Sequence, residues 1–233
     1  MALEIVGLVL GVIGLFGLPT LVWFFKHWLV STYWSLTGDR ATIEAALKDI
    51  AVRHSFPFDE PRNVATYGTV NVAWFVDLLS AVCESDDREI LDRLLARWIH
   101  LLGVKPDKVA VPKLGNVILA MTVAQRLRAP LAIVRQEAKH EIGRPSPFDG
   151  KVEAGDKVLL VDDVASDGVF LRVCVERLRS ASAQVIAVIV LVNRTEGSAA
   201  TDLEKAQIPF HALISLGDQE IEKLRQQQNG AAR

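Results

Sequence analysis

The amino-acid sequence predicts an α/β fold, a mostly parallel sheet flanked by helices, with one transmembrane helix added at the N-terminal end. Three observations carry this prediction. An apolar run at 158–161 is followed by two carboxylates, a glycine-bearing loop and an amphipathic segment at 169–178, an order typical of a buried parallel strand, a tight loop and a helix. A second pattern of strand, loop and helix fills 108–127. Near the N-terminus, residues 5–25 form an uncharged apolar run.

The composition is that of an ordinary folded domain without a strong charge bias. Of the 233 residues 50% are hydrophobic, and 26 basic residues nearly balance 28 acidic ones. This length allows one complete core and an additional element. No block of basic residues occurs, so we expect no nucleic-acid partner. Cys83 and Cys174 lie in apolar helical segments, and we expect both to be reduced core residues of an intracellular domain.

The run Ile5–Phe25 is long enough to cross a bilayer as a helix. It follows Glu4 instead of a basic region and lacks a small-residue cleavage site, which favours a retained anchor over a signal peptide. A buried core helix is the alternative, but the run has no polar face. Because Lys26 follows the span and no basic residue precedes it, the positive-inside rule predicts an N-terminus outside and a cytoplasmic domain. Gly7 and Gly11 have a spacing that lets two membrane helices approach.

The chain is therefore predicted to have three parts: a single-pass membrane anchor with an interfacial segment at 1–34, an α/β domain at 35–217 and a polar tail at 218–233. The domain begins with an amphipathic helix, 39–56, which Pro57 and Pro61 are expected to end. The next elements are two short strands around a glycine turn within 64–77, and a helix that Asp86 or Asp87 caps and Gly103 closes.

The remaining elements follow from apolar runs and the breakers between them. We expect strands at 108–111, 131–134, 184–192 and 210–214, helices at 117–127 and 199–206, and a flexible lid at 143–150. The tail is expected to hold a short helix.

The acid pair Asp162 and Asp163 is the first candidate site. Ligands of open α/β sheets bind where the strands end, and helix N-termini there offer N–H groups to anions. Two carboxylates at a strand tip suit ribose hydroxyls or a metal-bound sugar. The loop after them, with Ser166 and Gly168, suits a phosphate.

The segment 157–168 resembles the phosphoribosyl-pyrophosphate fingerprint of type I phosphoribosyltransferases, which has four apolar residues, two acids and a loop with Thr or Ser and Gly. Two further segments narrow the resemblance to orotate phosphoribosyltransferases, and together the matches cover residues 40–217. Residues 135–143 are similar to the family's Arg-Lys-x-x-Lys-x-His-Gly, which opens a mobile loop that often closes over the dimer partner's active site. Residues 64–77 resemble the family's hood, with its paired aromatic residues and acid.

The resemblance implies a homodimeric enzyme that uses Mg²⁺ and phosphoribosyl pyrophosphate and transfers the sugar phosphate to a nucleobase such as orotate. Asp162 and Asp163 would hold the ribose hydroxyls, directly or through metal-bound water. The loop residues Ser166, Asp167 and Gly168 would hold the 5′-phosphate. The resemblance also assigns pyrophosphate to Lys113, Gly115, Arg135 and Lys139, and the base to Phe75 and Arg194. A salt bridge with Glu196 or a nearby acid is the structural alternative for Arg194.

The chain departs from this family pattern at several positions. Thr66 and Tyr67 stand where the family has a base-contacting Lys, Gln136 replaces a Lys, and Val169 replaces a Thr or Ser. Asp167 adds a carboxylate to the phosphate loop, where repulsion from a phosphate about 5 Å away costs roughly 3 kcal/mol.

Three hypotheses are compatible with these residues. The first is a membrane-anchored phosphoribosyltransferase of the orotate type. The second is an enzyme with the same chemistry and another acceptor base. The third is a catalytically degenerate, membrane-tethered sensor or regulatory module that binds a nucleotide or related metabolite. The retained acid pair leads us to favour a transferase.

Overall fold

The computed structural model describes residues 40–64, 70–112, 116–135 and 146–231. The chain divides into two units, Met1–Ile43 and Glu44–Arg233, and all contacts given below lie within the second. The predicted membrane span lies outside the described residues. Within the part that is described, no helix is both long and apolar enough to cross a membrane.

The centre of the domain is a six-stranded sheet in the order β5-β4-β3-β6-β7-β8. All neighbouring strands run parallel except β5, which is antiparallel to β4. The mostly parallel α/β sheet is therefore confirmed. The strands are β3 (Lys108–Pro112), β4 (Leu131–Val134), β5 (Phe148–Asp149), β6 (Lys157–Ala165), β7 (Gln184–Arg194) and β8 (Phe210–Leu216).

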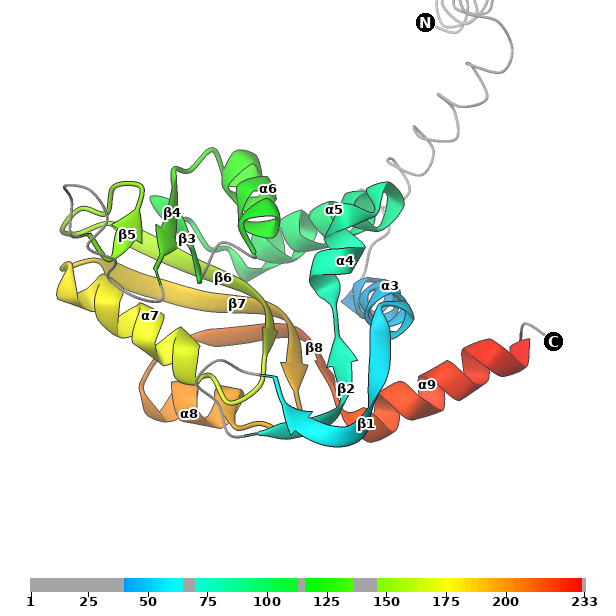
Figure 1. The fold of residues 1–233 in the computed structure, drawn as a ribbon. Helices are drawn as coiled ribbons and strands as arrows, with labels where there is room; N and C mark the ends of the chain where they lie inside the picture. Colours follow the sequence, from blue (N-terminus) through cyan, green and yellow to red (C-terminus); the bar gives the residue numbers. More distant parts are fainter. Residues whose placement is uncertain (1–39, 65–69, 113–115, 136–145, 232–233) are drawn as a thin grey trace, which may run out of the picture. The chain divides into compact units, whose positions relative to one another are not determined.

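Helices cover both faces of the sheet (Figure 1). On one face lie α4 (Leu78–Cys83), α5 (Ser85–Leu102) and α6 (Val117–Leu127), and on the other lie α7 (Val169–Ser180) and α8 (Ala199–Lys205). The chain moves outward from β3 to β4 in one direction and from β6 to β8 in the other. Right-handed crossovers in opposite directions place their helices on opposite faces. The strand order therefore reverses between β3 and β6, where α/β sheets form ligand crevices.

The core is built by the inner strands and the faces of the helices that cover them. On the α7 side, Val158 and Leu160 of β6 are fully buried together with Val175 and Leu178 of α7. Each such side chain contributes about 1.5–3 kcal/mol by its burial. This core holds the carboxyl end of β6 in place.

A two-stranded antiparallel sheet, β1 (Ser55–Asn63) and β2 (Asn71–Val76), forms the hood. It follows α3 (Arg40–Arg53). The expectation that Pro57 and Pro61 end this helix and precede the first strand is wrong, since both lie inside β1. A two-stranded sheet leaves open edges where a residue without an N–H is tolerated. The pairing register also shifts between Pro57 and Arg62.

The start of α5 differs from the prediction as well. Neither Asp86 nor Asp87 caps it, because the N-cap position is Glu84, without a side-chain cap. Asp87 is instead buried, with its carboxylate accepting hydrogen bonds from Arg53 at 2.8 and 3.0 Å and contacting His54 Nε2 at 2.7 Å.

Three further expectations change. Part of the predicted lid, Phe148–Asp149, forms the edge strand β5. The predicted short C-terminal helix is α9 (Asp218–Ala231), which occupies most of the tail. Cys174 is buried as expected, but Cys83 is exposed because it is the last residue of the short helix α4.

Candidate functional site

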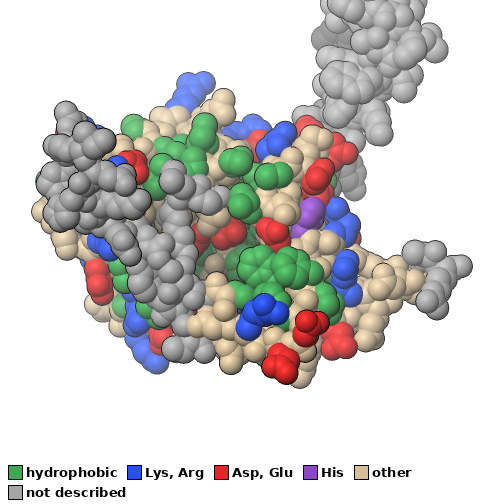
Figure 2. Space-filling view, in the orientation of Figure 1, with side chains coloured by type: hydrophobic (Ala, Val, Ile, Leu, Met, Phe, Trp, Pro, Cys, Tyr) green, Lys and Arg blue, Asp and Glu red, His purple; other side chains and the backbone are tan. Residues whose placement is uncertain are grey.

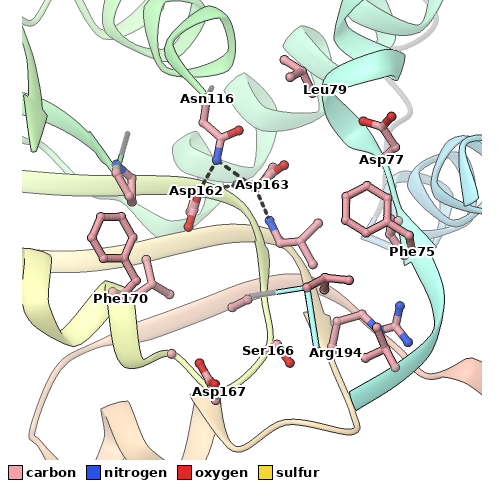
Figure 3. A pocket seen from close by; sticks show the side chains of 18 of the residues that line it. Phe75, Asp77, Leu79, Asn116, Asp162, Asp163, Ser166, Asp167, Phe170 and Arg194 are labelled. Carbon is pink, nitrogen blue, oxygen red and sulfur yellow. Dashed lines mark hydrogen bonds between the residues drawn. The ribbon is translucent and has the colours of Figure 1, made fainter. Parts of the chain in front are cut away.

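A cavity of about 330 Å³ lies where the carboxyl ends of β3 and β6 face the hood. Figure 3 shows the side chains that line it. One wall is β2 and the start of α4, and the floor is the end of β6 with the loop into α7. On the face that Figure 2 shows, acidic and hydrophobic side chains meet near the centre of the view. The position agrees with the predicted binding edge of the sheet.

Asp162 and Asp163 form the floor of this cavity, inside β6 rather than after it. Asn116, at the N-cap position of α6, donates from Nδ2 to both carboxylates, at 2.9 Å in the case of Asp163. Figure 3 shows the amide pointing at the acid pair. Burial raises the pKa of Asp163, whereas N–H groups of Val164 and Asn116 that donate to its carboxylate oppose this shift.

Asn116 is a site residue that the sequence reasoning missed. Its residue type and its place at the end of the β3–α6 loop were visible. Its contact with residues 46 and 47 positions away was not visible in any local pattern.

The loop after the acid pair lines the cavity with Ser166, Asp167 and Gly168, as predicted. Gly168 has φ of +68°, a conformation that L side chains rarely adopt. A Cβ on Gly168 would also lie 3.1 Å from Ala199 Cα and Cβ. The positive φ therefore favours glycine at this position, and the close approach of Ala199 leaves little room for a side chain.

Asp167 contributes a carboxylate to the start of α7. Its Oδ1 accepts a hydrogen bond from the Val169 N–H at 3.1 Å. That N–H belongs to the helix end at which an anion would bind. Ser166 Oγ is buried and has no hydrogen-bond partner among the described residues.

The hood side of the cavity is mainly apolar and aromatic. Phe75 lines it, and its ring packs against Phe56 with centroids 5.1 Å apart and against Phe58 at 6.1 Å. Asp77 lies at the edge of this wall (Figure 3). Asp77 also caps α4, since its carboxylate accepts from the Ser80 N–H at 3.0 Å and from Ser80 Oγ at 2.6 Å.

Arg194 lines the cavity, but its guanidinium is engaged elsewhere. The residue is 3% exposed. It donates to Glu196 Oε2 at 3.0 and 3.2 Å, to the Trp74 carbonyl at 2.8 Å and to Asp218. The structural alternative, a salt bridge with Glu196, is therefore present.

Of the other predicted cations, only Arg135 lies in the described part of the chain. Arg135 follows β4 and pairs with Asp149, with Nε 3.0 Å from the carboxylate. It is not among the residues that line the cavity. Lys113, Gly115 and Lys139 lie outside the described residues.

The carboxylates on the cavity floor fit a magnesium ion that takes its remaining ligands from water and substrate. Among the residues that the structure describes, no group of three or more His, Cys, Asp or Glu side chains could hold a metal. Mg²⁺ usually binds through one or two carboxylates, waters and substrate phosphates rather than a complete protein cage. Asp162 and Asp163, side by side on the cavity floor, provide such a pair.

Comparison with known proteins finds a matching protein family and similar relatives. The phosphoribosyl transferase domain family matches residues 87–209. An orotate phosphoribosyltransferase from Pyrococcus horikoshii is 32% identical over 145 residues, which are 62% of this chain and 77% of the relative.

Solved structures give the same picture for the fold. The orotate phosphoribosyltransferase from Aeropyrum pernix superposes with a TM-score of 0.62 at 25% identity, over 78% of this chain and 97% of that one. The Mycobacterium tuberculosis H37Rv orotate phosphoribosyltransferase in complex with phosphoribosyl pyrophosphate gives 0.56 at 20% identity, over 77% of this chain and 99% of that one. The latter similarity concerns the fold alone.

Proposed function

We propose, because this chain belongs to the phosphoribosyl transferase domain family, that it transfers ribose 5-phosphate from phosphoribosyl pyrophosphate to a nucleobase and releases pyrophosphate. The interpretation of the chain as a phosphoribosyltransferase, a glycosyltransferase, is confirmed by its relatives. The observation that carries the proposed reaction is the acid pair Asp162 and Asp163 on the cavity floor, hydrogen-bonded to Asn116.

The polar groups on the floor of the cavity have the following roles in this reaction. Asp162 and Asp163 bind the ribose hydroxyls, and their negative charge stabilises the positive charge that builds up at the anomeric carbon. Asn116 orients the two carboxylates. The Ser166 hydroxyl and the backbone around Gly168 bind the 5′-phosphate at the start of α7. A nitrogen of the base attacks the anomeric carbon as pyrophosphate leaves from the opposite side, which inverts that carbon.

Two further assignments rest on the family resemblance. Lys113, Gly115, Arg135 and Lys139 are proposed to bind the departing pyrophosphate. For Arg135 this requires its pair with Asp149 to open. When bound, Mg²⁺ would be held by Asp162 and Asp163 together with substrate oxygens, and it would neutralise charge on the pyrophosphate.

The membrane anchor is proposed from the sequence. Residues 5–25 would span a membrane once, with the N-terminus outside and the domain at 35–217 in the cytoplasm. Resistance of the chain to carbonate extraction from membranes, and its release by a deletion of residues 1–34, would support this arrangement. A homodimer is proposed on the family resemblance and on the small-residue spacing in the span.

The proposed reaction is tested by pyrophosphate release. Purified full-length chain in mild detergent receives phosphoribosyl pyrophosphate, Mg²⁺ and a mixture of anionic and neutral nucleobases. We expect release that falls at least about 100-fold in an Asp162→Asn/Asp163→Asn variant. Asp86→Asn, an exposed change on α5, is the matched control and retains full release. Absence of release in a chain that still binds phosphoribosyl pyrophosphate would refute the transferase.

That outcome would favour the membrane-tethered binding module, which was the third hypothesis from the sequence. One observation supports this candidate: the Asp167 carboxylate already accepts the Val169 N–H at the phosphate end of α7. A carboxylate in this position weakens the hold on the 5′-phosphate that the transfer reaction needs, while the acid pair on the cavity floor can still bind the sugar.

A further inference from the structure

We infer that the acceptor is an uncharged nucleobase rather than the orotate anion, and that the hood wall at 72–77 selects it. This inference rests on the proposed transferase function. The inference is drawn from the charged side chains that line the cavity.

The hood itself contains no cation for an acidic base. Between Arg62 and Arg88 the sequence has no Lys, Arg or His. Arg62 is exposed, and its guanidinium carbon lies 4.2 Å from the ring centroid of Phe58, which is not a cavity residue. No basic side chain of the hood therefore faces a base carboxylate.

Arg194 does not replace the missing cation. Its four hydrogen bonds go to Glu196, Asp218 and the Trp74 carbonyl, whereas a guanidinium has five N–H groups in all. The fork that would bind a base carboxylate in a bidentate way is thus occupied. Two carboxylates also outweigh its single positive charge.

The other charges in the cavity are negative. Of the described residues that line it, Arg194 is the only basic one, while Asp77, Asp162, Asp163 and Asp167 are acidic. A base carboxylate entering here meets like charges, and among the described residues of the lining only the engaged Arg194 could oppose them. Such like-charge contacts are unfavourable in other interfaces. Repulsion of this kind is a recognised means of specificity.

The same wall suits a flat, uncharged ring. Trp74 and Phe75 supply aromatic surface, and Val72 and Val76 supply apolar edges. Phe75 is held in place by the rings of Phe56 and Phe58. The Asp77 carboxylate at the rim can accept an N–H from the base, because each of its oxygens has a second lone pair beyond its bond to Ser80.

The inference is tested by measuring kcat/KM for each base separately, with saturating phosphoribosyl pyrophosphate and the full-length chain. The bases are orotate, uracil, adenine and hypoxanthine. We expect the best neutral base to exceed orotate by at least about tenfold. Preference for orotate would overturn the inference and leave the proposed function standing. Absence of release with every base would overturn both.

A charge substitution at the cavity rim makes the test specific. Val64 lines the cavity and is 42% exposed, so it tolerates a longer side chain. Val64→Lys is expected to raise kcat/KM for orotate about tenfold relative to the best neutral base. Val64→Met, of similar length without charge, should leave that ratio at the wild-type value. A ratio that Val64→Lys does not move would contradict selection by charge.

Discussion

The buried Arg194 and the partly exposed Asp218 form an ion pair that fixes the hood on the central sheet. Asp218 accepts the backbone N–H of Ala73 at 2.7 Å and that of Trp74 at 3.1 Å. Arg194 donates to the carbonyl of the same Trp74 at 2.8 Å. A residue at the end of β7 and one at the start of α9 thus hold one segment of the cavity wall from both sides.

Arg194→Met is expected to destabilise the domain strongly. It leaves the carboxylates of Glu196 and Asp218 next to each other without their cation. Because both carboxylates are partly exposed, we expect a cost of about 1–3 kcal/mol. Urea denaturation followed by tryptophan fluorescence measures the change. Lys205→Met, which removes an exposed partner of Asp202, is the control and should keep the wild-type midpoint. Equal midpoints for both variants would contradict the hood attachment.

Asp87 is expected to make the domain sensitive to acid. The Arg53 guanidinium that donates to its carboxylate, with a smaller contribution from His54, lowers the pKa of Asp87 below its ordinary value of 3.8. The unfolded chain therefore binds this proton more readily. The stabilisation is present above pH 3.8 and is lost as the pH falls through the folded-state pKa.

Comparison of wild type with Asp87→Asn between pH 7 and pH 3 tests this linkage. Because Arg53 is partly exposed, we expect a difference of about 1–2 kcal/mol in the free energy of unfolding at pH 7. This difference should shrink below pH 4. Asp86→Asn, one position earlier and exposed, should follow the wild-type curve. Parallel curves for wild type and Asp87→Asn would rule out the effect.

Asp167→Ser is expected to strengthen binding of phosphoribosyl pyrophosphate. The serine hydroxyl can still accept the Val169 N–H, while a charge that repels the phosphate by roughly 3 kcal/mol at 5 Å is removed. Calorimetric titration with Mg²⁺ present should show a Kd that is lower by about tenfold or more. Asp167→Asn, which keeps the shape of the side chain, should act in the same direction. Weaker binding in both variants would mean that the Asp167 carboxylate itself holds the ligand.

Comparison of Gly168→Ala with Gly155→Ala distinguishes the effect of backbone strain from the effect of a changed cavity lining. Both glycines have positive φ, +68° and +85°, so each alanine costs about 1–2 kcal/mol of stability. Only the alanine at 168 meets another residue, Ala199, and only that position lines the cavity. We expect affinity for phosphoribosyl pyrophosphate to fall about tenfold in Gly168→Ala and to stay unchanged in Gly155→Ala. An equal loss of affinity in both would contradict the role of Gly168.

The elements defined by local pattern were predicted well. The helix at 117–127 and the strand at 131–134 agree with α6 and β4 to the residue, because apolar periodicity and the breakers between them are local signals. β1 was missed, since two prolines argue against a strand and their tolerance depends on where the partner strand lies.

The candidate site was predicted in part for the same reason. The acid pair and the loop at 166–168 are contiguous, and their joint place at the cavity follows from the strand that carries them. The partners of Arg194 and Asn116 are set by the fold. Asp218 is 24 positions from Arg194, and Asp162 is 46 from Asn116. The family motif indicated that Arg194 contacts the base. The structure shows in addition that its guanidinium donates to the carboxylates of Glu196 and Asp218.

The attachment of Ala73 to Asp218 also sets an order for the biogenesis of this domain. The two residues are 145 positions apart. At about 5–20 residues per second, the ribosome makes the hood roughly 7–30 s before the carboxylate that accepts its N–H groups. During translation the hood can pair its own two strands, but its docking must wait for the start of α9. The hood wall of the cavity thus depends on a residue that is translated after every strand of the central sheet.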